Sequence, residues 1–92
     1  MHDWTLISIL FEWGNARAVL KFRRRGNEAV EITAEGVSKL HIPQINEWGP
    51  SVSVNHTQGP TASGAGDQNL CIEMQSGDVI EITATSFIFP AD

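Results

Sequence analysis

The chain lacks most of the features on which a function is usually assigned. It has one cysteine in 92 residues, so no internal disulfide can form, and a reducing, cytoplasmic setting is expected. No run of about 18 apolar residues is present, so no membrane-spanning helix is expected. The apolar segment 6–11 is too short for a span, and no basic leader precedes it, so no signal peptide is expected.

Catalytic motifs are missing as well. The sequence has no P-loop, no dinucleotide-binding glycine motif, no serine elbow and no HExxH zinc motif. The three histidines and Cys71 lack the short paired spacing of zinc ligands, so neither a metal site nor a cofactor is expected. Cys71 could meet His41 or His56 on a neighbouring strand, but its alternating strand pattern favours a packing role. The sequence therefore predicts a protein that is not an enzyme.

Basic residues are absent from positions 40–92, whereas six acidic residues fall there, and the net charge is −5. This balance argues against nucleic acid as a partner. Five of the six basic residues lie within nine positions, which segregates positive charge on one hairpin. We interpret four of them as a candidate surface for a protein partner, the alternative being a solvated strand and turn that resists aggregation. These four are Lys21, Arg23, Arg24 and Arg25.

What the chain does have is period-two alternation of apolar and polar residues. The clearest case is 70–89, where alternation on both sides of the turn at 76–78 predicts a hairpin. No helix pattern, internal repeat or domain boundary is evident. The sequence predicts one all-β domain over 1–92, a small antiparallel barrel or sandwich of about seven strands, with a barrel preferred because it exposes fewer edges. The five strands before the hairpin are expected at 4–13, 18–23, 29–35, 37–45 and 51–56.

Three loop features have functional or structural consequences. The segment 58–69 is small and polar, and it is expected to be an irregular, mobile loop. Trp48, beside Gly49 and Pro50, is either an anchor for a partner or a plug for the barrel. In the last hairpin, a three-residue turn would place Glu73 opposite Glu81, and a two-residue turn would place Gln75 opposite Ile80.

Two strands carry apolar residues on both faces, which favours self-association. The strand 4–13 is apolar on both sides, and a strand buried on both faces in so small a domain is often covered by another subunit. The terminal run at 87–89 has the same property, so Phe87 and Phe89 are candidate contact residues. A homo-oligomer, most simply a two-fold dimer, is expected.

The segments WGPSVSVN (48–55) and IEMQSGDVIEITA (72–84) resemble those of small uncharacterised bacterial all-β proteins. The resemblance implies a bacterial source and no activity. The sequence thus favours a non-catalytic binding or interaction module that self-associates. The alternative is an accessory or immunity-type protein that binds another protein through its charged faces, and a small enzyme comes third.

Overall fold

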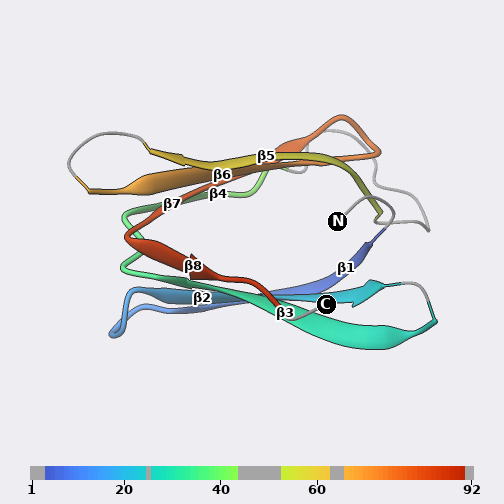
Figure 1. The fold of residues 1–92 in the computed structure, drawn as a ribbon, viewed down its shortest axis with the longest axis horizontal. Helices are drawn as coiled ribbons and strands as arrows, with labels where there is room; N and C mark the ends of the chain where they lie inside the picture. The colour runs from blue at the N-terminus through green and yellow to red at the C-terminus, as the bar shows by residue number, and fades with distance from the viewer. Residues whose placement is uncertain (1–3, 25, 44–52, 63–65, 91–92) are drawn as a thin grey trace.

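A computed structural model describes residues 4–24, 26–43, 53–62 and 66–90, and within these ranges every regular element is a strand. Eight strands form two antiparallel sheets that face one another (Figure 1). Sheet A has the order β1-β2-β3-β8 and sheet B the order β4-β7-β6-β5. The predicted all-β fold is confirmed. The strands are β1 (Thr5–Glu12), β2 (Arg17–Arg24), β3 (Glu28–Glu35), β4 (Lys39–His41), β5 (Val54–Ala62), β6 (Gln68–Met74), β7 (Val79–Ala84) and β8 (Ser86–Ile88).

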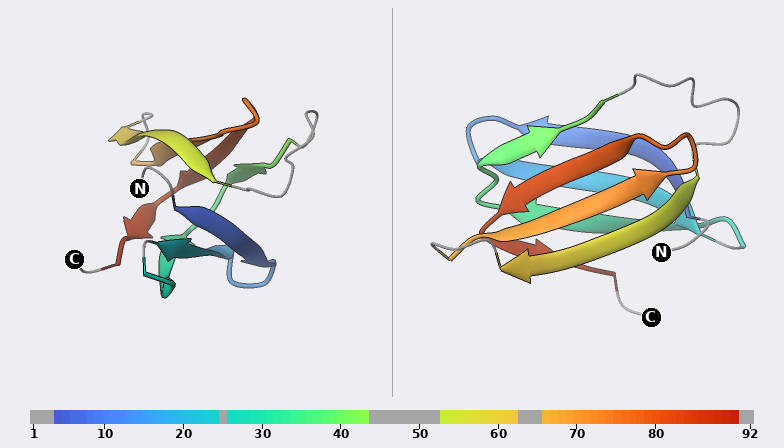
Figure 2. Two further views of the ribbon diagram at one scale, coloured as in Figure 1. Left: turned by 90° about the vertical axis from the view of Figure 1, so that its right-hand side faces the viewer. Right: turned by 90° about the horizontal axis from the view of Figure 1, so that it is seen from above.

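Two chain crossings connect the sheets at one corner of the molecule. The chain leaves sheet A between β3 and β4, and it returns from sheet B between β7 and β8, so the expected last strand is two strands. The crossings lie side by side, because Ser38 N–H donates to the Thr83 carbonyl and Thr85 N–H donates to the Glu35 carbonyl, both at 2.9 Å. An isolated bridge between Thr5 and Ser53, with Val54 N–H donating to the Trp4 carbonyl at 2.7 Å, also connects the start of β1 to the start of β5. The result is a sandwich with a shared corner (Figure 2).

The two halves of the chain repeat one arrangement about an internal two-fold. Strands β1, β2 and β3 form one antiparallel meander, and β5, β6 and β7 form another. Leu20 lies opposite Ile32, and fifty positions later Leu70 lies opposite Ile82. The halves exchange their last strands, since β4 joins the second meander and β8 joins the first. The expectation of no repeat was wrong, and the identical Glu-Ile-Thr-Ala at 31–34 and 81–84 is its visible trace.

Strand β1 is not buried on both faces, which corrects the expectation for this strand. The register shifts between Leu6 and Ser8, so that Leu6 lies opposite Phe22 whereas Ile9 lies opposite Leu20. Phe22 and Leu20 both point into the core, so this β-bulge moves the inward face from even to odd positions. The apolar residues that the sequence pattern assigns to both faces therefore form one inward row, at even positions before the bulge and at odd positions after it. The outward Leu10 is 59% exposed.

The segment 58–69 is also more regular than expected. Strand β5 continues through Ala62 and β6 begins at Gln68, with Gln58 opposite Cys71. Backbone pairing with a central strand orders this segment without apolar side chains, and Pro60 is tolerated because β5 is an edge strand. The expected irregular structure was wrong for 58–62 and 68–69, while 63–65 lie outside the described residues. Mobility of this segment stays a prediction.

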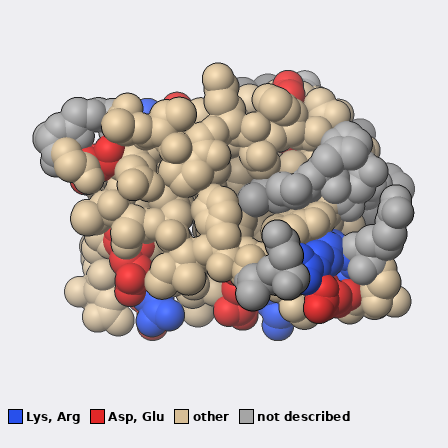
Figure 3. Space-filling view, in the orientation of Figure 1, with Lys and Arg blue, Asp and Glu red and all other residues tan. Residues whose placement is uncertain are grey.

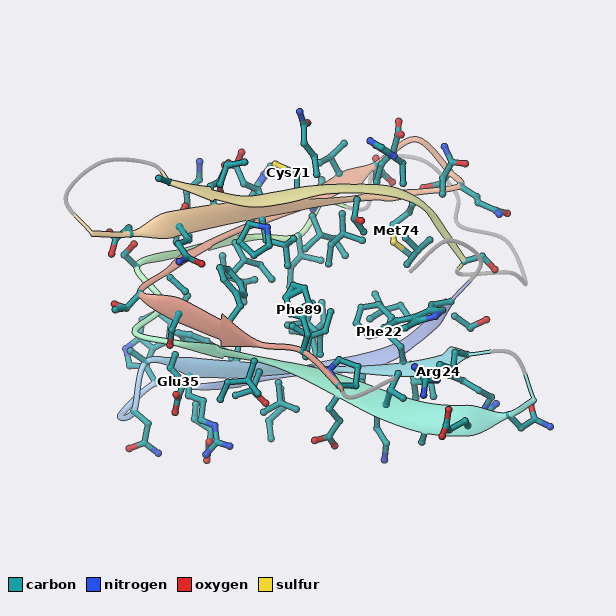
Figure 4. The ribbon with its side chains drawn as sticks, viewed as in Figure 1. Phe22, Arg24, Glu35, Cys71, Met74 and Phe89 are labelled. Atoms are coloured by element: carbon teal, nitrogen blue, oxygen red, sulfur yellow. The ribbon has the colours of Figure 1, made fainter. Side chains whose placement is uncertain are left out.

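The inward rows of both sheets form one hydrophobic core. Its largest fully buried side chains come from both halves of the chain, and Figure 4 shows Phe22 and Met74 between the sheets. In the described part of the chain, no helix is long and apolar enough to cross a membrane. The fully buried side chains are Leu20, Phe22, Ile32, Val54, Leu70, Ile72, Met74, Ile80 and Ile82.

Candidate binding pocket

An apolar pocket of about 360 Å³ lies where the β1–β2 turn meets β4. Strands β1 and β4 are edge strands of their sheets, so the pocket opens between two sheet edges. Its volume is in the range of pockets that take small ligands. The lining residues are Phe11, Trp13, Ala16, Val37, Ser38, Lys39 and Leu40.

Backbone hydrogen bonds fix the shape of the pocket. Ala16, which has a positive φ of 49°, donates its N–H to the Trp13 carbonyl and closes the β1–β2 turn. Val37 N–H then donates to the Ala16 carbonyl at 2.8 Å, which connects this turn to the corner before β4. The Trp13 ring packs edge-on against Phe11 with centroids 5.0 Å apart, yet Trp13 is 86% exposed. A large aromatic surface is therefore presented at the rim of the pocket.

The internal two-fold explains why space remains at this position. In sheet A, β8 places Phe87 opposite the buried Ala34, and Phe87 packs against the core. In the other half of the chain, the residue fifty positions before Phe87 is Val37, which also packs against the core and lines the pocket. Ala84 is the counterpart of Ala34, fifty positions later. The smaller valine thus stands where the other half of the molecule carries a phenyl ring.

Charge at the mouth of the pocket is compensated. The Lys39 ammonium forms an ion pair with Glu81 on the neighbouring strand. The hydrogen bond from Lys39, followed by its positive charge, lowers the pKa of the Glu81 carboxyl, and Asn69 and His41 add smaller effects against a burial that raises it. Because Lys39 is neutralised in place, the pocket presents hydrocarbon and one hydroxyl without a net charge.

The basic cluster expected from the sequence is divided by the fold. Lys21 and Arg23 are exposed on the outer face of β2. Arg24 belongs to the opposite face, where it forms an ion pair with Glu28 and its guanidinium lies 5.8 Å from the centre of the Trp4 ring (Figure 4). Arg25 and Trp48 lie outside the described residues.

The hairpin of β6 and β7 has neither of the two registers expected from the sequence. Its turn holds four residues, 75–78, so Glu73 lies opposite Val79 and Glu81 lies opposite Cys71. This register avoids the direct opposition of two carboxylates, which is unfavourable. The longer turn is stabilised by Met74 N–H donating to the Asp78 carbonyl at 2.8 Å.

Cys71 and the two described histidines lie on the outer face of sheet B, away from the pocket. The Cys71 thiol donates to the Glu81 carboxylate at 3.9 Å, and His56 lies opposite Glu73. A second, smaller hollow of about 200 Å³ is lined by His56, Gln58, Cys71, Glu73 and Val79. Within the described ranges, no three His, Cys, Asp or Glu side chains are grouped to hold a metal ion.

The terminal aromatic residues are placed between the sheets. Phe87 is half-buried and contacts Phe89 edge-on at 6.5 Å, while Phe89 is 42% exposed. Ile88, between them, points outward and is 55% exposed. The sequence did not predict a site at Phe11, Trp13, Val37 and Leu40, and the signal available for one was an aromatic residue, Trp13, directly before the turn at Gly14.

Comparisons with protein-family models, curated proteins and solved structures give no match.

Proposed function

We propose that this chain is a small non-catalytic binding module, which accepts an uncharged aromatic ring in the pocket between β1 and β4 and self-associates through another face. The observation that carries the ligand class is the exchange of Phe87 for the smaller Val37 between positions that are fifty residues apart and related by the internal two-fold. The protein itself fills one of these positions with a phenyl ring. A flat ring of similar size therefore matches the space left at the other.

The composition of the pocket supports the same ligand class. Phe11, Val37 and Leu40 supply hydrocarbon contacts, and Trp13 can cover a bound ring from the rim. Ser38 donates its hydroxyl to the Thr83 carbonyl at 3.4 Å, which leaves its oxygen able to accept a hydrogen bond from an N–H or O–H of the ligand. Since Lys39 is paired with Glu81, a charged ligand gains no partner there.

Binding without chemistry is proposed because the reactive side chains lie elsewhere. Cys71, His41 and His56 belong to the outer face of sheet B, whereas the pocket is lined mostly by hydrocarbon. The accessory-protein alternative relies on charged faces of the molecule, and the pairing of Arg24 with Glu28 weakens the basic one. The free Cys71 remains the reason for expecting a cytoplasmic setting, and the sequence resemblance remains the reason for expecting a bacterial one.

Indole is a suitable probe, because it is an uncharged ring with one N–H donor. We expect saturable binding with a dissociation constant below about 1 mM, followed by amide and side-chain NMR shifts at Trp13, Val37 and Leu40. The variant Val37→Phe places in the pocket the ring that Phe87 supplies in the other half, so it should weaken indole binding at least tenfold while the strand spectrum is kept.

The matched control is Leu10→Ser. Leu10 lies on β1, beside the pocket residue Phe11, but it faces the outside of sheet A, so this variant should bind indole as the unmodified chain does. Shifts confined to the outer face of sheet B, or equal binding by a folded Val37→Phe variant, would remove the pocket from the proposal. Absence of saturation up to several millimolar would overturn the ligand class.

A further inference from the structure

We propose that the outer face of sheet A binds a second copy of the chain about a two-fold axis that runs parallel to the strands, between β2 and β3. This inference rests on the self-association in the proposed function and names its surface. It assigns the contact to outward residues of the sheet and not to Phe87, which packs against the core.

An apolar row crosses the whole outer face of sheet A. The register places Leu10 opposite Val19, Val19 opposite Thr33, and Thr33 opposite Ile88, so one row spans all four strands. Its two ends, Leu10 and Ile88, are 59% and 55% exposed. Two large aliphatic side chains at the ends of one row offer apolar contacts that a lone chain leaves in water.

Charged rows lie on either side of the apolar row. On one side Glu12, Arg17 and Glu35 are in register, and on the other Lys21 lies opposite Glu31. With Arg23, the outward face carries three basic and three acidic residues, although the whole chain has a net charge of −5. Figure 3 shows positive and negative groups interspersed along the lower margin, where sheet A lies. A balanced face is not repelled by a copy of itself.

Two two-fold axes lie in the plane of the contact, one parallel to the strands and one along the apolar row. The order of the charges favours the first. An axis parallel to the strands places β2 over β3 of the copy with each row over itself. Arg17 then meets the copy's Glu35, Lys21 meets its Glu31, and Leu10 meets its Ile88. An axis along the apolar row would instead place Arg17 near the copy's Lys21, a like-charge contact that opposes binding. The favoured axis also keeps the strands of the two sheets aligned, as in stacked sheets.

The size of the face predicts a weak dimer. Four strands at about 4.8 Å spacing and four outward rows at about 7 Å give a footprint on the order of 400–500 Å² per copy. The total of about 800–1,000 Å² is at the low end of specific interfaces. We therefore expect a dissociation constant in the range of about 10–100 µM.

The test uses two charge variants of the full chain. The acidic variant Arg17→Glu/Lys21→Glu makes β2 negative opposite the copy's negative β3, and the basic variant Glu31→Lys/Glu35→Lys makes β3 positive opposite the copy's positive β2. Each variant alone should therefore be monomeric by sedimentation at about 100 µM, a concentration at which about half or more of the unmodified chain should be dimeric. An equimolar mixture should form a heterodimer, because every changed side chain then meets its opposite.

General attraction between the variants is not the cause of such a heterodimer. Each substitution changes the charge by two units, so from −5 the acidic variant has −9 and the basic variant −1, and both remain negative. A third variant, Leu10→Ser/Ile88→Ser, keeps the charge and should weaken the dimer at least fivefold, even if a charge variant fails to fold.

Each outcome decides a separate question. A dimer that persists in both charge variants and in Leu10→Ser/Ile88→Ser would place the interface elsewhere, and self-association would stand without this surface. An unmodified chain that is monomeric at about 100 µM would overturn both proposals on association, while the pocket is tested independently by indole. Monomeric variants whose mixture also stays monomeric would overturn the proposed pairing of charges across this face.

Discussion

Val37 and Lys39 lie close together in the chain, and each sets a different property of the pocket. Val37 determines the free volume, because its counterpart fifty positions later is the larger Phe87. Lys39 determines the electrostatics, because its ammonium is paired with Glu81 on β7. Since Trp13 at the aromatic rim is 86% exposed, these two residues would restrict the size and charge of the ligand in the proposed function.

The pairing of Lys39 with Glu81 predicts a pH dependence. Lys39 lowers the pKa of Glu81 below its ordinary value of 4.5, so the folded state favours the ionised carboxyl more than the unfolded chain does. The resulting stability is present above that ordinary value and is lost as the pH falls through the lowered pKa. In Lys39→Met, the NMR-measured pKa of Glu81 should rise toward 4.5.

The control for this prediction is Lys21→Met, which removes a lysine from sheet A opposite Glu31 and should leave the pKa of Glu81 unchanged. A Glu81 pKa that moves equally in both variants would show an effect of net charge and not of the ion pair. A Glu81 pKa that stays low in Lys39→Met would assign the effect to Asn69 and His41 instead.

At the scale of elements, the corner between β3 and β4 depends on Gly36. This residue has a positive φ of 68°, and a Cβ added to it would lie 2.8 Å from the Cβ of Thr85 on the neighbouring crossing. Gly36→Ala should therefore destabilise the fold by about 1–3 kcal/mol, through backbone strain and the displaced crossing. Urea unfolding measures this loss.

Gly14 gives the matched control, because a Cβ there would have no neighbour within 4 Å. Gly14→Ala should change the unfolding free energy by no more than about 0.5 kcal/mol. A change of no more than about 0.5 kcal/mol in Gly36→Ala as well would show that the corner tolerates a side chain, and that Gly36 has no special role in joining the sheets.

Period-two alternation was sufficient to predict most strands, because each inward row is apolar. It could not place the bulge at Ile7, because a strand whose inward face changes at a bulge and a strand that is apolar on both faces have the same sequence pattern. It also missed the pairing of 58–62, because a Gly- and Pro-containing edge strand is ordered by its backbone partner and not by its own side chains. The pocket could not be predicted from the alternation either, because it joins residues from β1 and the turn after it to others on β4.

At the scale of the whole molecule, the internal two-fold relates strands that have different roles in the two halves. The strand exchange makes β4 and β8 equivalent, yet β8 completes the core with Phe87 while β4 leaves a pocket beside Val37. The outer faces differ as well, since that of sheet A holds balanced charges and an apolar row, whereas that of sheet B holds Cys71 and the histidines. Two halves with the same strand arrangement thus give one side where the core is filled, at β8, and one side with a pocket, at β4.

Salt should act in opposite directions on the unmodified chain and on the acidic variant Arg17→Glu/Lys21→Glu. Opposite charges face each other in the proposed dimer, so raising the NaCl concentration from about 0.1 to about 1 M shortens the screening length from about 10 to about 3 Å and should weaken the unmodified dimer several-fold. In the acidic variant the same screening removes repulsion between carboxylates, so association through Leu10 and Ile88 should strengthen. Sedimentation at both salt concentrations measures the two slopes. Slopes of the same sign would mean that Arg17 and Lys21 do not face Glu35 and Glu31 of the copy, because only facing charges make the effect of salt depend on this exchange.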